Sequence, residues 1–165
     1  MQPLDSTGLR ADIASTWTDV LRTLEDIELL SDHPGTIEVR AAANILHDFY
    51  TGIESIAERI ALAFEGDLPQ GRDWHAALLR RMAAAIPRRR PELFSAELAH
   101  RLDEYLRFRH VVRHSYGFRL NAGRVSQLLR DVKPLAQDVG SAVAEFDRFL
   151  ASLNQDQAPD DLKGA

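Results

Sequence analysis

Residues 45–64 read ILHDFYTGIESIAERIALAF, and this stretch decides the fold class. Its large apolar side chains recur at intervals of three or four residues: Ile45, Phe49, Ile53, Ile56, Ile60 and Phe64. That interval places them on one face of an α-helix, whereas a half-buried strand would alternate apolar and polar residues. The stretch therefore predicts a long amphipathic helix that buries one face against other elements.

The same helical spacing extends through the rest of the 165 residues, without sustained strand alternation. It predicts four further helices, around residues 13–27, 74–86, 95–109 and 121–150. Asp73 and Asn121 are expected as N-caps, Gly117 as a helix terminator, and Pro134 as the cause of a kink or split in the last helix. We therefore expect an all-α fold, an antiparallel bundle of four to five helices.

The length and composition predict the domain organisation and the cellular location of this bundle. It forms one domain over residues 1–153, and the polar residues 154–165 are expected to be a flexible C-terminal tail. The chain has no cysteine, no apolar run long enough for a bilayer and no secretory signal at its start, so we expect a cytoplasmic location and no membrane. The net charge of -5 argues against a protein that coats nucleic acid, but it is compatible with one local basic site for RNA.

Arg109 lies on the apolar seam of the fourth predicted helix, where a leucine would be expected. Its guanidinium either pairs with an acid on another helix, reaches past the seam to solvent, lies at an interface or binds an anion. His110 and His114 lie four residues apart on one helical face. A metal site there would need a third ligand, and because no acid on that face offers one, no metal is expected.

The order Arg109-x4-His114-x-Tyr116, with the polar His110 directly after the arginine, resembles the signature of HEPN ribonucleases, and the added tyrosine resembles the HepT branch. The stretches 46–54 and 74–75 are similar to HepT-like proteins too, so the resemblance covers most of residues 10–150. It implies a metal-independent endoribonuclease toxin of a type VII-like toxin–antitoxin pair. Such an enzyme needs no cofactor and acts on RNA as a homodimer.

The resemblance also implies a role for each residue of the motif. His114 does acid/base work, Arg109 binds the phosphate and the transition state, and His110 supports them. Tyr116 is the residue to which a cognate minimal nucleotidyltransferase, the antitoxin, adds AMP. The added anion beside the catalytic pair would silence the enzyme. A homodimer, or a larger hetero-oligomer with the antitoxin, is the assembly expected.

The chemistry independently favours two chains. RNA cleavage without a metal needs a base, an acid and a cation that stabilises charge on phosphorus. One chain offers one histidine in this motif, so pairing two copies would bring two His114 and two Arg109 side chains into one cleft. Five residues along a straight helix rotate by about 140°. Arg109 and His114 therefore share a site only if the helix ends or distorts between them, or if two chains contribute.

Two other functions fit the same residues. A non-catalytic HEPN module could bind a nucleotide, or position a substrate for a nucleotidyltransferase, with the same arginine and histidine. A helical interaction protein would carry both residues incidentally. The cluster Arg88-Arg89-Arg90 has two interpretations as well, either a guide for RNA or a solvated turn between helices.

Overall fold

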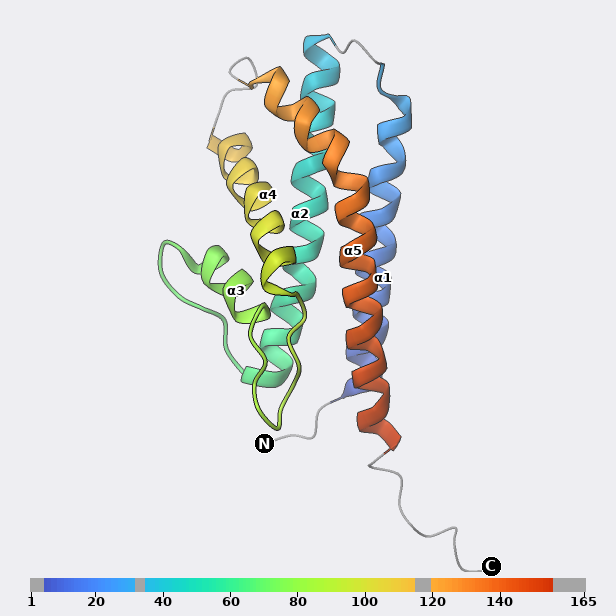
Figure 1. Cartoon of the computed structure of the whole chain (residues 1–165), viewed down its shortest axis with the longest axis vertical. Coiled ribbons are helices and arrows are strands. Elements are labelled where there is room, and N and C mark those ends of the chain that lie inside the picture. Colours follow the sequence, from blue (N-terminus) through green and yellow to red (C-terminus); the bar gives the residue numbers. More distant parts are fainter. Residues whose placement is uncertain (1–4, 32–34, 115–119, 156–165) are drawn as a thin grey trace, which may run out of the picture.

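The structure, a computed structural model, describes residues 5–31, 35–114 and 120–155 of the chain. Within these ranges no strand is present beyond one isolated bridge. The elements are α1 (Ser6–Glu25), the short 3-10 helix η1 (Asp26–Leu29), α2 (Thr36–Glu65), α3 (Trp74–Met82), α4 (Ala96–His114) and α5 (Ala122–Gln155). The four long helices lie side by side with alternating directions (Figure 1). The predicted all-α antiparallel bundle is therefore confirmed.

Helix α2 is the central element, because it packs against each of the other four helices. The six large apolar side chains whose spacing predicted this helix are all buried: Ile45, Phe49, Ile53, Ile56, Ile60 and Phe64. Burying one large apolar side chain contributes about 1.5–3 kcal/mol, so this stripe is a main source of stability. The short helix α3 lies against the outside of α2 and α4 (Figure 1).

The predicted end of the third helix was wrong. Helix α3 ends at Met82, and Ile86, which the spacing assigned to the helix, forms an isolated bridge with Arg90. There the backbone N–H of Ile86 donates to the carbonyl of Arg90 at 2.9 Å. Pro87 is the physical reason, since a proline disfavours the helical conformation in the residue before it.

The two predicted N-caps differ in the structure. Asn121 Oδ1 accepts a hydrogen bond from the backbone N–H of Arg124 at 3.0 Å, which confirms it as the cap of α5. Asp73 occupies the N-cap position of α3, but its side chain makes no capping hydrogen bond. The predicted terminator Gly117 lies outside the described residues.

Helix α5 contains Pro134 and continues through it without a split. Its first part leans away from the axis of the remainder (Figure 1), so the helix bends. It extends to Gln155, and Asn154, which the sequence assigned to the tail, donates from Nδ2 to Thr7 Oγ1 at 3.2 Å. The rest of the predicted tail, residues 156–165, lies outside the described residues.

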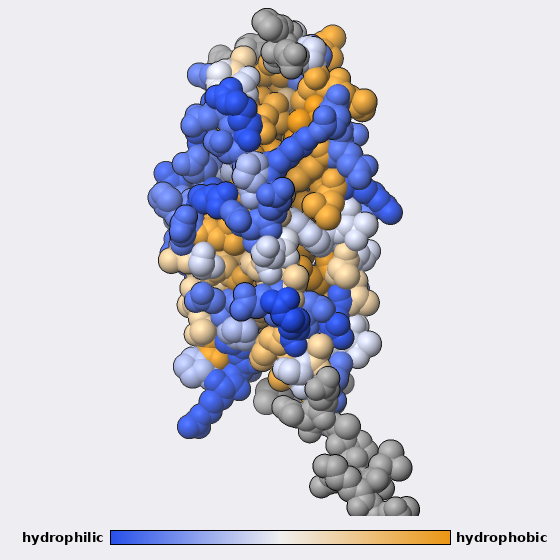
Figure 2. Space-filling view, turned by 45° about the vertical axis from the view of Figure 1, so that its right-hand side comes forward, coloured by the Kyte–Doolittle hydropathy of each residue, from blue (hydrophilic) through white to orange (hydrophobic). Residues whose placement is uncertain are grey.

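The face formed by α1 and α5 carries hydrophobic residues gathered toward one end, with hydrophilic residues over much of the remainder (Figure 2). A hollow of about 490 Å³ is lined by residues of both helices, among them Trp17, Leu21 and Ala136. In the ranges that the structure describes, none of the helices combines the length and the apolar character needed to cross a membrane.

Candidate functional site

Arg109 is held inside the bundle by an acid on another helix. Its side chain emerges from the buried face of α4, and the residue is only 7% exposed. Arg109 Nη1 donates to Glu54 Oε1 of α2 at 2.5 Å, and Glu54 is itself 5% exposed. The sequence left open whether Arg109 pairs with an acid, reaches solvent, lies at an interface or binds an anion. In the single chain Arg109 forms a buried ion pair, whereas the proposed chemistry had placed it in an open cleft between two chains.

Glu54 binds a second partner through its other oxygen. His75, the second residue of α3, donates from Nδ1 to Glu54 Oε2 at 2.7 Å. Because a carboxylate only accepts, Nδ1 carries the hydrogen and Nε2 is the ring atom left for another contact. His75, Glu54 and Arg109 thus connect α3, α2 and α4 in one network. Both Glu54 and His75 lie in the stretches similar to HepT-like proteins, and the sequence alone assigned neither of them a role.

A signal for Glu54 was present in the sequence. It follows Ile53 directly and lies four residues after Tyr50, so it shares the helix face of a buried aromatic. A carboxylate at such a position needs a cation or a hydrogen-bond donor. The residue that supplies the cation is 55 positions away, which helical spacing does not identify.

Near this ion pair, two other titratable side chains have raised pKa values, which favours their neutral forms. The guanidinium carbon of Arg109 lies 5.8 Å from the centre of the Tyr50 ring, within the range of a cation–π contact. Burial, and then the nearby Glu54 carboxylate, raise the pKa of the Tyr50 phenol above its ordinary value. The same two causes, in the same order, raise the pKa of Glu58. None of the described residues accepts a hydrogen bond from the buried Arg109 Nε.

His110 and His114 lie at the surface, at the end of α4. Their ring centres are 4.3 Å apart with an angle of 34° between the planes, so the imidazoles are in contact. His114 Nδ1 donates to the backbone carbonyl of His110 at 2.8 Å. Because a carbonyl only accepts, Nδ1 carries the hydrogen, and Nε2 is the ring atom left for another contact.

Helix α4 runs without interruption from Ala96 to His114. It therefore neither ends nor breaks between Arg109 and His114, which point in directions about 140° apart along a regular helix. One is buried and the other is exposed, so a single chain does not bring them together in one open site. Tyr116, the expected modification site, lies outside the described residues.

The arginine cluster before α4 does not form a uniform basic surface. Arg88 and Arg89 are exposed, but Arg90 is buried and donates to Glu65 Oε1 from Nη2 at 2.7 Å. The same guanidinium also donates to three backbone carbonyls. Arg90 is therefore a structural residue of the connection between α3 and α4, and both earlier interpretations of the cluster were wrong for it.

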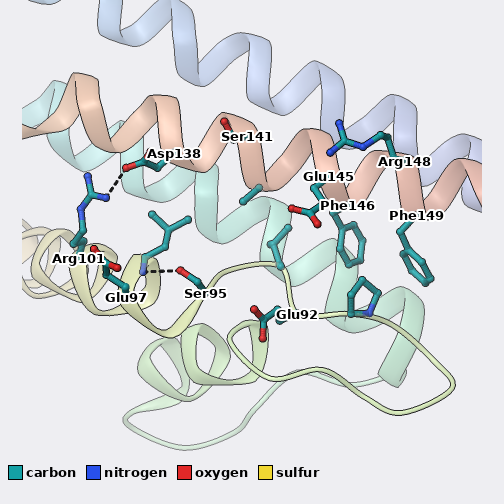
Figure 3. Close-up of a pocket in the computed structure, with 14 residues that line it drawn as sticks. Glu92, Ser95, Glu97, Arg101, Asp138, Ser141, Glu145, Phe146, Arg148 and Phe149 are labelled. Carbon is teal, nitrogen blue, oxygen red and sulfur yellow. Dashed lines mark hydrogen bonds and ion pairs between the residues drawn. The ribbon is translucent and has the colours of Figure 1, made fainter.

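A hollow of about 710 Å³ lies between the start of α4 and the C-terminal half of α5. In Figure 3, Arg101 is bonded to Asp138 at its edge, and the side chains of Phe146 and Phe149 lie along α5. Four acids and two arginines line it: Glu92, Glu97, Asp138 and Glu145 with Arg101 and Arg148. Its charge does not favour an anion, and it contains no residue of the Arg109–His114 motif.

No three histidine or acidic side chains of residues 5–31, 35–114 and 120–155 are placed to hold a metal ion together. The described part of the site is an arginine buried against a carboxylate, followed on the same helix by the two imidazoles of His110 and His114, which contact each other.

The fold and this site define a small helical-bundle protein with an arginine and two histidines in the last turns of α4. Residues 41–150 match the family described as HepT-like protein, and because this is more than half of the chain, the chain belongs to the HepT-like family. No curated protein and no solved structure matches the chain.

Proposed function

We propose that the chain is a metal-independent endoribonuclease toxin of a type VII-like toxin–antitoxin pair, which cleaves RNA in the cytoplasm at the interface of a homodimer. The observation that carries the proposal is the position of His114. It is an exposed imidazole, fixed through Nδ1 to its own helix and free at Nε2, in a chain of the HepT-like family. This is the form in which a histidine can exchange a proton with a substrate.

In the proposed reaction, the 2'-hydroxyl oxygen attacks the adjacent phosphorus, and the bond from phosphorus to the 5'-oxygen breaks. One His114 removes the hydroxyl proton, and a second His114 donates a proton to the departing 5'-oxygen. The products are a 2',3'-cyclic phosphate and a free 5'-hydroxyl, so protons and bonds balance without a metal. Arg109 stabilises the negative charge that develops on the phosphate oxygens, and His110 orients His114 through ring contact.

The unbroken helix α4 supports a site shared between two chains. Since Arg109 and His114 of one chain point in different directions, a phosphate that meets both takes them from different protomers. Exposed apolar side chains are available for such contact. Val111, between the two histidines, is 49% exposed, and Leu29 and Ile37 are 81% and 82% exposed. Side chains of this kind are what a second protomer would cover.

We also propose that a cognate minimal nucleotidyltransferase silences the toxin by adding AMP to Tyr116. The tyrosine oxygen would attack the α-phosphorus of ATP, pyrophosphate would leave, and the phenol proton would pass to a base of the partner. The new phosphodiester would repel a substrate phosphate. Mass spectrometry after co-expression with the partner should show the added AMP on the wild type and not on Tyr116→Phe. An unmodified wild type that the partner still silences would contradict this mechanism.

The nuclease itself is tested with purified protein and RNA in the presence of EDTA. His114→Ala should lower cleavage by about 100-fold to 10,000-fold, the range that one acid/base group contributes. Arg109→Lys keeps a positive charge beside Glu54 but loses the planar fork, and cleavage should fall by about 100-fold. His47→Ala, on α2 and outside the motif, serves as the control and should leave cleavage unchanged. Intact RNA with the unmodified wild type would overturn the proposal, and RNA binding without cleavage would favour the non-catalytic module.

The shared site is tested by co-expressing wild-type and His114→Ala chains in equal amounts. If both histidines of a dimer are needed, only dimers of two wild-type chains cleave, and activity falls to about a quarter. If each chain cleaves by itself, half of the activity remains.

A further inference from the structure

A groove of about 750 Å³ lies along the junction of α3 and α4, and it has two kinds of lining. Its floor is apolar and includes Ala76, Leu79 and Leu106. Its polar lining consists of three arginines, three histidines and two aspartates: Arg72, Arg80, Arg107, His75, His100, His110, Asp73 and Asp103.

The groove reaches the candidate site through two of its histidines. His110 lines the groove, and its ring contacts the His114 ring with centres 4.3 Å apart. His75 also lines it and is bonded through Nδ1 to Glu54, the carboxylate that holds Arg109. A molecule in the groove would therefore contact His110, which touches His114, and His75, which shares Glu54 with Arg109.

The charges of the groove favour a negatively charged molecule. Arg107 is paired with Asp103 at 2.7 Å, which neutralises one cation. Arg72 and Arg80 are exposed, and neither has an ion pair within the described part of the chain; with Asp73 as the remaining acid of the lining, its arginines and aspartates sum to a charge of +1. The chain as a whole has a charge of -5, and the hollow on the α5 side of α4 has more acids than arginines (Figure 3). The α3–α4 groove is thus a local exception in an acidic protein.

We propose that the α3–α4 groove binds a single RNA strand, with its phosphates on Arg72 and Arg80 and its bases against the apolar floor. Sites for single-stranded nucleic acid combine a cationic rim with surfaces on which bases pack, and histidine rings and guanidinium planes serve as such surfaces. Because Glu54 occupies His75 Nδ1, the remaining ring nitrogen Nε2 donates to a phosphate oxygen in the groove when it is protonated. The proposal deepens the nuclease function proposed above, because it states where the substrate strand binds before the scissile phosphate reaches His114.

The test measures binding separately from cleavage. A fluorescent 2'-O-methyl RNA has no free 2'-hydroxyl, so it binds the full-length protein without being cut. Arg72→Ala with Arg80→Ala should weaken binding at least tenfold. The matched control is Arg40→Ala with Arg148→Ala, two exposed arginines without ion pairs to described residues, and it changes the net charge equally. Its affinity should stay within twofold of the wild type.

Salt dependence provides a second measurement on the same proteins. Each phosphate contact to a single strand adds about 0.7 to the slope of log affinity against log salt, so loss of both groove arginines should reduce that slope by about 1.4. Circular dichroism should show both double variants folded, since all four side chains are exposed.

The outcomes separate this proposal from the nuclease. If the wild type binds RNA through Arg72 and Arg80 but never cuts it, the groove proposal holds and the nuclease proposal fails. If the wild type cuts RNA and both double variants bind and cut equally well, the groove proposal fails and the nuclease stands. A groove variant that binds RNA normally but turns from dimer to monomer in light scattering would show that a second chain covers the groove, which also overturns the proposal.

Discussion

Replacing Glu54 by glutamine tests whether the buried ion pair stabilises the bundle. Glutamine keeps the shape of the side chain but removes the negative charge beside Arg109, which is 7% exposed and 2.5 Å away. Removing one partner of a buried pair leaves an uncompensated charge and costs about 3–5 kcal/mol. For a domain of this size each kcal/mol lowers the melting temperature by about 2–4 °C, so Glu54→Gln should lower it by about 6–20 °C.

The assay is urea and thermal unfolding followed by circular dichroism, with an exposed ion pair as the control. Glu104 pairs with Arg124 at 3.1 Å, and their side chains are 51% and 39% exposed. Glu104→Gln should therefore cost less than about 1 kcal/mol. Replacing the buried pair together, with Glu54→Leu and Arg109→Met, should recover most of the lost stability, because neither charge is then left unpaired.

Equal losses for Glu54→Gln and Glu104→Gln would refute the reasoning, since a charge left alone in the interior cannot cost the same as one in water. A double replacement that is less stable than Glu54→Gln would refute it as well. In that case the apolar pair would fit the site worse than a lone guanidinium does.

Three further predictions concern other parts of the bundle. A Cβ on Gly52 would lie 2.2 Å from Val20 Cγ2, so Gly52→Ala should cost about 1–3 kcal/mol in urea unfolding, and Val20→Ala in the same chain should relieve much of that cost. Burial raises the pKa of the Glu58 carboxyl group, so the folded state binds the carboxyl proton more tightly than the unfolded state does. The stability of the protein should therefore fall as the pH rises above the ordinary pKa of a glutamate. Thermal melts of Glu58→Gln across the same pH range should lack that decline. Arg90→Ala should cost about 3–5 kcal/mol, because its guanidinium satisfies a carboxylate and three carbonyls, whereas Arg89→Ala should stay within about 0.5 kcal/mol of wild type in the same assay.

The sequence was sufficient for the bundle because local spacing determines it. Each long helix shows an apolar stripe, and the glycines and prolines between the stripes mark the turns. The end of α3 was missed for a reason that is also local. Ile86 continues the helical interval, but Pro87 and the bridge to Arg90 remove it from the helix.

The candidate site was predictable only in part. Spacing placed Arg109 on the buried face of its helix and His114 in the motif, but both the ion-paired and the open arrangement of Arg109 remained consistent with the sequence. The choice depends on Glu54 and His75, which lie on two other helices and reach Arg109 only through the packing of α2, α3 and α4. Periodicity describes which face a residue lies on, and it says nothing of the polar partner that faces it.

The buried guanidinium also bears on the proposed dimer. Arg109 Nε is buried, and within the described residues it has no acceptor, a condition that costs about 1–3 kcal/mol in a folded protein. Glu54 already accepts from Arg109 through one oxygen and from His75 through the other. A phosphate oxygen would supply the missing acceptor only if dimerisation opens a path to this atom, which is buried in the single chain. Under the proposed mechanism, the imidazole that meets this phosphate would come from the second protomer, because His114 of the same chain points elsewhere.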